Sequence, residues 1–342
     1  MGNATFRRRR KRKRVPSWSK IKSNLTSSKT SLTDRWVALQ FCRKRAPSRE
    51  ELGKVLIEAL KFNKESVLMR HEIAFALGQT GRGVETLKRI MRDSENEDEV
   101  TRHEAAESLS TLVNCKNDFE TYAKNRDRFP ILADTCALAL EGMRRFLSGE
   151  TDAAFAPCCG CQTHKNKEKT SSSSSTSQKI MTMEEEIAAC AVLRDTQASL
   201  YDRYEACFEL RDRHLHLDIA VKAIACALEK DTSSACFRHE LAFTLGILGS
   251  PDSENVLISK LGDTSEHSVV RHEAALALQC IASDSAERAL CRVSKRATED
   301  VMVRESCIVA LAMRSYILMD DDDEKEKYGL VGEYIFGFGG GQ

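Results

Sequence analysis

Four His-Glu pairs are the residues of this sequence best suited to chemistry. Each pair follows an Arg, and the pairs are His71-Glu72, His103-Glu104, His239-Glu240 and His272-Glu273. Mixed imidazole and carboxylate ligands suit iron or manganese, and two His with one Glu is the facial set of non-haem Fe(II) oxygenases. Carboxylate-bridged di-iron centres in helical proteins also use inward-facing Glu and His. The pairs therefore predict a metal centre, whereas a zincin is excluded because none of them is HExxH.

The spacing of the pairs shows a duplication. The intervals between neighbouring histidines are nearly equal, 103 − 71 = 32 and 272 − 239 = 33, whereas the interval between the two sets is much larger, 239 − 71 = 168. Neighbouring helices pack about 8–10 Å apart, and a metal–nitrogen bond spans only about 2 Å. Histidines on adjacent units can therefore share one metal. We expect one centre at His71 and His103 and another at His239 and His272.

The elements that position these pairs are short amphipathic segments. Two such segments recur in each unit of just over 30 residues, which is typical of an α-solenoid whose units bury their apolar faces only by stacking. The predicted fold is all-α, a HEAT-like α-solenoid with two arrays of four helical-hairpin repeats, residues 32–148 and 187–318, that face each other. The outer units have other residues at the His position, as capping repeats do: Trp36, Asp134, Tyr204 and Glu305.

Three segments lie outside the predicted arrays. Residues 1–31 are predicted to be a disordered basic arm, whose run RRRRKRKR at 7–14 is a nuclear import signal, an RNA contact, a solvated arm or an alternative start of translation. Residues 149–186 are predicted to be a flexible Cys/Ser-rich linker, whose Cys158, Cys159, Cys161 and His164 do not have the spacing of a zinc site. Residues 319–342 are predicted to be a disordered acidic and Gly-rich tail.

Composition narrows the class of protein. The 52 basic and 51 acidic residues nearly cancel, so we expect no direct nucleic-acid binding. No stretch approaches the about 20 apolar residues of a membrane span, and the N-terminus has no secretory h-region. Thirteen cysteines, an odd number within apolar helical segments, indicate reduced thiols of a cytosolic protein. We therefore expect a cytoplasmic protein, with a nuclear pool possible through the basic arm.

Helix chemistry offers a simpler explanation that must be weighed. One Glu in a first helical turn complements the helix dipole and needs no metal. Four His-Glu pairs confined to the central units of both arrays are not explained in this way. The Arg before each His, in contrast, is interpreted as a solvated or ion-paired residue.

With these motifs in place, the sequence resembles the deoxyhypusine hydroxylase family. The resemblance covers roughly residues 32–316 and includes FRHE, two copies of RHEA and a closing VRESC. It implies an α-helical HEAT-repeat dyad with a non-haem di-iron centre that uses O2 to hydroxylate deoxyhypusine on translation initiation factor 5A, forming hypusine. We expect the protein to be a monomer. The implied ligand sets are His71, His103 and Glu104 for one iron, and His239, His272 and Glu273 for the other.

The same resemblance implies that Glu72 and Glu240 face the aminobutyl side chain of the substrate. This division is chemically reasonable because a desolvated ammonium group needs carboxylate partners. Two alternatives stay open at the level of sequence. They are a non-catalytic HEAT-like scaffold and a lyase of the phycobilin type, and metal analysis of the purified protein would discriminate between them and the hydroxylase.

Overall fold

The structure, a computed structural model, describes residues 16–110, 113–150 and 180–317. Within these ranges every regular element is helical, which confirms the all-α class. The first array contains α1 (Trp18–Leu25), α2 (Leu32–Arg45), α3 (Arg49–Phe62), α4 (Val67–Gln79), α5 (Val84–Arg92), α6 (Glu99–Leu109), η1 (Val113–Cys115), α7 (Lys116–Ala123) and α8 (Pro130–Leu147). The second contains α9 (Met183–Arg194), α10 (Leu200–Arg213), α11 (Leu217–Lys230), α12 (Ala235–Leu248), η2 (Pro251–Ser253), α13 (Glu254–Gly262), α14 (Ser268–Ile281), α15 (Asp284–Ser294) and α16 (Val301–Ile317).

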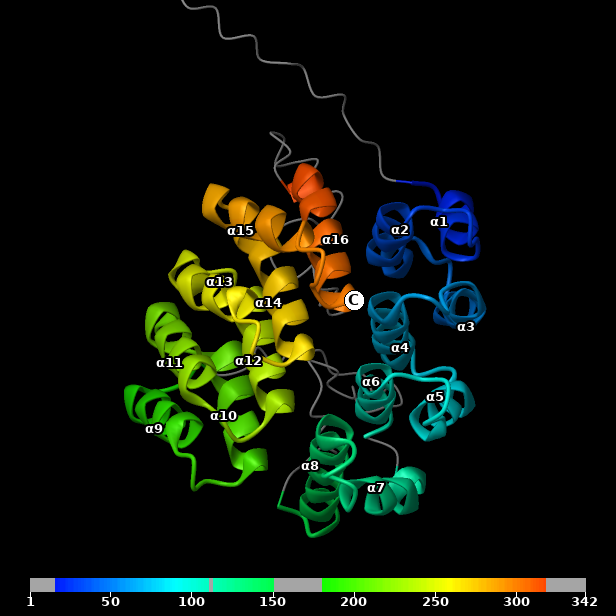
Figure 1. The fold of residues 1–342 in the computed structure, drawn as a ribbon. Coiled ribbons are helices and arrows are strands. Elements are labelled where there is room, and N and C mark those ends of the chain that lie inside the picture. Colours follow the sequence, from blue (N-terminus) through cyan, green and yellow to red (C-terminus); the bar gives the residue numbers. More distant parts are fainter. Residues whose placement is uncertain (1–15, 111–112, 151–179, 318–342) are drawn as a thin grey trace, which may run out of the picture.

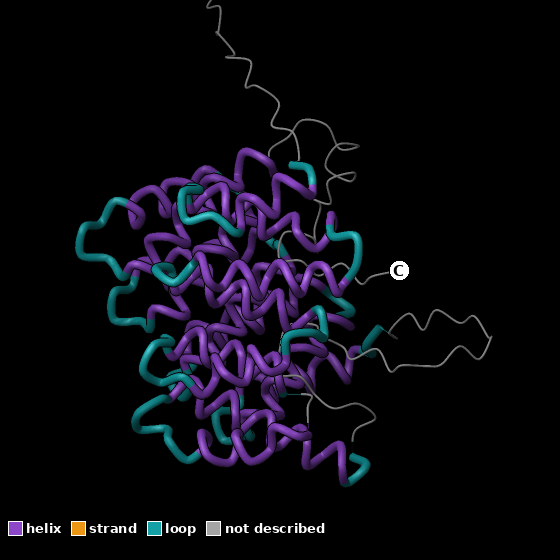
Figure 2. The backbone as a smooth tube through the Cα atoms, turned by 90° about the vertical axis from the view of Figure 1, so that its right-hand side faces the viewer, coloured by secondary structure: helices purple, strands orange, loops and turns teal. Residues whose placement is uncertain are grey.

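Consecutive α-helices pack in pairs, so each array is a stack of four helical hairpins. The even-numbered helices line the inside of the molecule and the odd-numbered helices form the outer layer (Figure 1). Each inner helix also packs against the next inner helix of its array, from α2 through α8 and from α10 through α16. Figure 2 shows this stack of helices from the side. The two predicted arrays of four hairpin repeats are therefore present.

The two arrays face each other and close into a ring. The last inner helix of the first array, α8, packs against α10 and α12, and the last inner helix of the second, α16, packs against α2 and α4. Two buried serines bridge the arrays at these contacts. Ser66 donates a hydrogen bond to Glu305 (2.7 Å) and Ser234 donates one to Asp134 (2.6 Å). The interval between the two serines equals that between His71 and His239, so the closure repeats the internal duplication.

Helix caps place the four histidines at equal depth. Each His lies five residues after the N-cap of its helix, and these N-caps are Ser66, Asp98, Ser234 and His267. Each cap side chain accepts a hydrogen bond from a backbone N–H of the first turn, which fixes where the helix begins. Because the four helices start at equivalent points of stacked repeats, their His side chains point to one region.

Close packing fixes the distance between the inner helices as well. A Cβ added at Gly78 of α4 would lie 2.1 Å from the Ser108 Oγ of α6, far inside van der Waals contact. Leu68, Ile73 and Leu77 of α4 are fully buried in the core. Glycine at position 78 therefore lets the two helices that carry the first pair of histidines come together.

The boundaries of the arrays differ from those expected. The segment 1–31 was predicted to be disordered, but α1 lies within it and packs on α2 as the first helix of the first hairpin. Ser17 caps α1, and its only fully buried apolar residues, Ile21 and Leu25, are too few to give a clear periodic pattern. In the same way α9 begins at Met183, inside the expected linker, behind a capping box formed by Thr182 and Glu185.

The rest of the predicted arm, linker and tail lies outside the described residues, and so do the basic run at 7–14 and the Cys/His group at 158–164. Among the helices that the structure does describe, none has both the length and the apolar character needed to cross a bilayer.

Candidate metal centre

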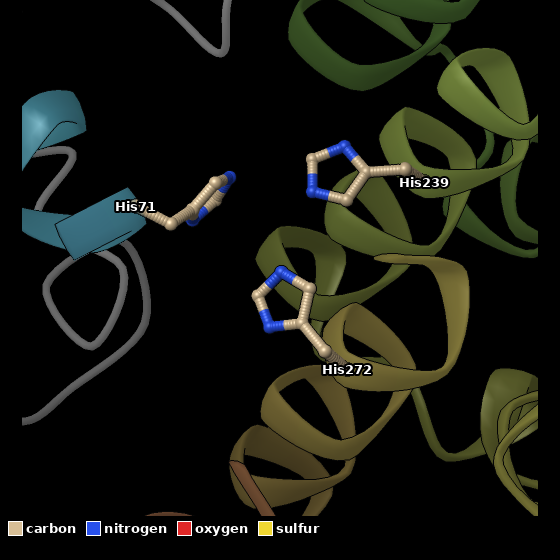
Figure 3. A group of neighbouring side chains, drawn as sticks. All are labelled: His71, His239 and His272. Atoms are coloured by element: carbon tan, nitrogen blue, oxygen red, sulfur yellow. The ribbon is translucent and has the colours of Figure 1, made fainter. Parts of the chain in front are cut away.

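The four histidines of the His-Glu pairs meet at the centre of the ring. The ring centroids of His71 and His103 are 5.6 Å apart, and those of His239 and His272 are 5.7 Å apart. Distances between the arrays are just as short, at 5.1 Å from His71 to His272 and 5.6 Å from His103 to His239. Figure 3 shows His71 of α4 facing His239 and His272 of the opposite array. The two expected centres therefore form one cluster.

Two glutamate side chains lie close to the Nε2 atoms of the imidazole rings. Glu104 Oε2 is 3.2 Å from His71 Nε2 in the first array. Glu273 Oε2 is 3.4 Å from both His239 Nε2 and His272 Nε2 in the second. All five side chains are at most 7 % exposed. Each array therefore supplies a carboxylate to its own histidines, as the predicted ligand sets require.

The polar atoms of this cluster lack the partners that a purely structural core would provide. Buried polar groups are almost always hydrogen-bonded, because an unsatisfied one costs about 1–3 kcal/mol. Within the described residues, the buried atoms without a hydrogen bond include the Nε2 of all four histidines and the Oε1 of Glu104, Glu240 and Glu273. A metal ion needs several imidazole nitrogens and carboxylate oxygens close to one point, and it displaces their protons when it binds. The residues present therefore fit a metal centre with mixed His and Glu ligands.

Three groups of side chains place their possible ligand atoms close enough together to bind one metal ion, and one of these groups is a predicted ligand set. His71, His103 and Glu104 each offer an atom within 4.8 Å of the others. The same is true of His71, His239 and His272, and of Glu72, His272 and Glu273, which join residues of both arrays. In the second predicted set, Glu273 contacts both His239 and His272. Glu72 is thus close enough to the cluster to be a competing ligand as well as a substrate residue.

Electrostatics differ sharply between the four imidazoles. Burial lowers the pKa of His71, but the Glu104 and Glu72 carboxylates outweigh burial and raise this pKa to about 10. Burial, followed by repulsion from His71, lowers the pKa of His239 to about 3. Burial and the neighbouring imidazoles also hold the pKa values of His103 and His272 well below 6.5. Three imidazoles are therefore neutral at pH 7, which is the form that binds a metal.

Burial raises the pKa values of two glutamates of the second array. Burial raises the pKa of Glu240 to about 8, with Arg211 opposing this and the Glu273 and Glu104 carboxylates adding to it. Burial, followed by the Glu72 carboxylate, raises the pKa of Glu273 well above 4.5. A cation placed in this cluster would favour the ionised forms of both groups. The site is therefore suited to binding a cation.

A narrow cavity leads to the cluster and is lined by residues that the sequence analysis did not single out. Phe75 and Phe243 face each other across it, with ring centroids 6.4 Å apart. They occupy equivalent positions of the two arrays, so the duplication that identified the His-Glu pairs is a signal that could also have identified them. Glu107 and Trp36 line the cavity too. Their repeat equivalents differ in type. Trp36 is at the His position of the first repeat, which the sequence analysis interpreted as a capping repeat, and no sequence signal marked Glu107 as a site residue.

The Arg before each His serves the fold. Arg70 is ion-paired with Glu97, and Arg238 and Arg271 are ion-paired with Glu266 (2.8 Å) and Glu299 (2.6 Å). These three pairs confirm the interpretation of the Arg as an ion-paired residue. The fourth, Arg102, is buried instead, where it donates to the Met91 carbonyl (2.9 Å) and lies over the Phe129 ring at 4.3 Å.

A closed ring of HEAT-like hairpins around buried, unpartnered His and Glu atoms defines a helical-repeat protein with a candidate metal centre. No family model matches the chain. The chain is, however, 32 % identical to deoxyhypusine hydroxylase of Gibberella zeae, over 92 % of each chain. It is 34 % identical to deoxyhypusine hydroxylase of Saccharomyces cerevisiae, over 85 % of this chain and 87 % of the relative.

A solved structure agrees with these relatives. Human deoxyhypusine hydroxylase in complex with glycerol superposes with a TM-score of 0.70 and 26 % identity, covering 87 % of this chain and 96 % of the human chain. The chain belongs to the deoxyhypusine hydroxylase family. The expectation of an oxidoreductase of this family is confirmed.

Proposed function

We propose that this chain hydroxylates the deoxyhypusine side chain of translation initiation factor 5A to form hypusine, with O2 as co-substrate and two irons per chain. The observation that carries the proposal is the cluster of four buried imidazoles, whose Nε2 atoms have no hydrogen-bond partner in the described part, together with the carboxylates of Glu104 and Glu273. The names of the relatives supply the substrate, since deoxyhypusine is the group on which such a hydroxylase acts.

Six side chains would hold the two irons. His71, His103 and Glu104 form the first set, and His239, His272 and Glu273 form the second. Iron bound in this way supplies the activation of dioxygen. Insertion of one oxygen atom into a C–H bond reduces the other atom to water and requires two electrons from an external donor. The protein contributes ligands, orientation and a site shielded from water.

The residues that line the cavity suit an aliphatic chain that carries positive charge, because they combine aromatic rings with carboxylates. Deoxyhypusine is such a chain, with ammonium groups that need carboxylate partners once they leave water. Glu72 and Glu240 line the cavity beside the cluster and would accept these hydrogen bonds. The Phe75 and Phe243 rings would enclose the methylene groups and exclude water from the reacting carbon. A cation beside Glu240 would also bring its raised pKa down, so that the carboxylate ionises as the substrate binds.

One chain supplies both ligand sets and closes its own ring, so we propose that the monomer is the active form. We also propose a cytoplasmic location. The ten cysteines within the described residues are all unpaired, as expected for a reducing compartment. Size-exclusion chromatography with light scattering, and imaging of the tagged full chain, test these two points separately.

The function is tested by reconstitution. The purified chain is loaded with Fe(II) without oxygen, mixed with deoxyhypusine-bearing factor 5A, and exposed to O2 and a reductant. Mass spectrometry should show the gain of one oxygen atom on the modified lysine, and labelled O2 should be its source. His71→Ala and His239→Ala should abolish the product. If the loaded wild-type chain binds the factor but never adds oxygen, the proposed function is wrong.

A further inference from the structure

The last inner helix of each array carries an acid followed by a hydroxyl residue where the central repeats carry His-Glu. These dipeptides are Asp134-Thr135 on α8 and Glu305-Ser306 on α16. In both, the hydroxyl residue lies at the position of the Glu, one residue beyond that of the His. Thr135 and Ser306 are buried beside the metal centre, at 1 % and 0 % exposure. Their equivalent places in the two arrays indicate a common task.

Each hydroxyl lies against the Nδ1 of the neighbouring histidine. Thr135 Oγ1 is 3.3 Å from His103 Nδ1, and Ser306 Oγ is 3.4 Å from His272 Nδ1. Each hydroxyl also donates its single proton to the carbonyl one turn earlier in its own helix. These bonds run from Thr135 to Ile131 O (3.0 Å) and from Ser306 to Met302 O (2.7 Å).

Because each hydroxyl donates its proton to a carbonyl, the direction of its hydrogen bond with the histidine is fixed. A hydroxyl whose proton is taken can only accept, so the imidazole must donate from Nδ1. Cys236 Sγ lies 3.4 Å from Thr135 Oγ1 and is a second possible acceptor for the Thr135 proton. If the hydroxyl donates to this sulfur and not to the carbonyl, it still has no proton left for His103, so the imidazole is again the donor. Glu107 Oε2 lies 3.7 Å from the same Nδ1 of His103, which is beyond hydrogen-bond distance.

We propose that Thr135 and Ser306 are positioning residues that hold His103 and His272 as the Nδ1–H tautomer. The lone pair of each ring then lies on Nε2, the atom that is buried and unpartnered in the described cluster. The proposal rests on the metal centre of the proposed function. Partners of this kind on the distal nitrogen orient a ligating His and increase its affinity for metal.

The acid of each dipeptide fixes the place of the hydroxyl. Asp134 accepts a hydrogen bond from Ser234, and Glu305 accepts one from Ser66. Both serines are N-caps of the helices that carry the first histidine of the opposite array. One side chain of the dipeptide thus anchors the helix across the ring closure, while the other orients a histidine of its own array.

The test removes each hydroxyl with little change in shape, using Ser306→Ala and Thr135→Val. The ¹⁵N chemical shifts of the His rings in the metal-free protein report the tautomer, and titration with Fe(II) under anaerobic conditions reports affinity. Ser306→Ala should lose the Nδ1–H state of His272 and weaken metal binding by about 10- to 100-fold. Thr135→Val should have a smaller effect, because the Glu107 carboxylate, 3.7 Å from His103 Nδ1, needs only a small shift to accept the bond that Thr135 gives up.

Two controls separate positioning from stability. Thr101→Val removes a fully buried hydroxyl that makes no hydrogen bond in the described part of the chain, so it should change neither readout. Ser306→Thr and Thr135→Ser keep a hydroxyl and should retain wild-type tautomers and affinity. If Ser306→Ala fails to fold, the ¹⁵N spectrum of the metal-free wild type still shows which nitrogen of His272 carries the proton. A proton on Nε2 of His272 there, or unchanged affinity in Ser306→Ala, overturns the proposal.

The tautomer is read without metal, substrate or turnover. An inactive iron-loaded wild type would therefore reject the proposed function and leave this result intact.

Discussion

Glu72 and Glu104 look alike in sequence, and a matched pair of substitutions separates their roles. Glu104 approaches His71 at Nε2 and Glu72 approaches the same ring at Nδ1, both at 3.2 Å. Glu104 is 3 % exposed, whereas Glu72 is 14 % exposed and lines the cavity. Glu104→Gln and Glu72→Gln remove one charge each and keep the size of the side chain. If the proposed roles are correct, the first should lose iron and the second should lose substrate.

The structure sets the size of the first effect. The two carboxylates keep the pKa of His71 at about 10 instead of 6.5 despite burial. At about 1.4 kcal/mol per pH unit, this difference is ~5 kcal/mol for one positive charge. If the two carboxylates share this effect about equally, each stabilises a positive charge in the site by roughly 2–3 kcal/mol. Glu104→Gln should therefore weaken binding at the first iron site by roughly 30- to 150-fold.

The second effect follows from hydrogen bonding to a charged group. Loss of one such bond costs about 1.5–3 kcal/mol, so Glu72→Gln should weaken binding of deoxyhypusine-bearing factor by roughly 10- to 150-fold. Iron per chain is measured by elemental analysis after anaerobic loading, and substrate affinity by calorimetry on the metal-free protein. Glu85→Gln, on a side chain that is 87 % exposed, is the matched control and should change neither quantity.

One result would refute this assignment. Glu72 also lies within 4.8 Å of ligand atoms on His272 and Glu273, so a role as an iron ligand is geometrically open to it. If Glu72→Gln lowers iron content as fully as Glu104→Gln does, Glu72 is a ligand and the division of roles within the pair is wrong.

Three further outcomes are expected. The metal-free protein should lose stability as pH rises from 7 to 8, because folded His71 and Glu240 keep their protons up to about 10 and 8 while the unfolded groups release them near 6.5 and 4.5. The folded state then binds more protons at these two groups, which lowers stability by roughly 2 kcal/mol per pH unit. His103, His239 and His272 partly offset this near pH 7, because their pKa values are lower in the folded state. Urea titration measures the slope, and a flat profile contradicts the pKa values. Iron at 100 times its Kd should stabilise the fold by ~2.7 kcal/mol for each site that it fills, and a chelator should reverse the shift in Tm. No shift would mean that iron does not bind the folded site. Gly78→Ala should destabilise by about 1–3 kcal/mol in the same urea assay, because its Cβ would overlap Ser108; wild-type stability would show that α4 and α6 are not so closely packed.

The sequence predicted the repeat architecture and the cluster of histidines because both depend on local pattern. Hairpin units of equal length put the same position of each inner helix on the same face, so four His-Glu pairs in register imply a common site. The first helix was missed because α1 buries few apolar residues, and Ile21 and Leu25 alone do not make a period. The ring closure was foreseen only as two arrays facing each other. Its contacts, such as Ser66 with Glu305, join residues 239 apart.

The division into two centres was the least complete part of the prediction. Spacing along the chain pairs His71 with His103. In the structure, however, the His71 ring is closer to the His272 ring than to the His103 ring. Curvature of the stacked hairpins brings the arrays this close, and curvature depends on small rotations between repeats that the spacing does not encode. The partners of the histidine Nδ1 atoms were missed for a similar reason, since Thr135 and Ser306 lie in repeats that the sequence analysis assigned to capping.

The chemistry of the cluster itself argues against a scaffold. A scaffold would gain stability from an apolar centre, since buried imidazoles and carboxylates without partners each cost about 1–3 kcal/mol. This chain retains seven such atoms at the closure of its two arrays, on the four histidines and on Glu104, Glu240 and Glu273. Neither array contains all of them, so only the closed ring assembles the complete site. Such a cost is typical of functional sites, where local rules are broken for the sake of binding. A ligand that supplies the missing partners, as a metal ion does, must therefore stabilise the closed ring, which couples metal binding to the docking of the two arrays.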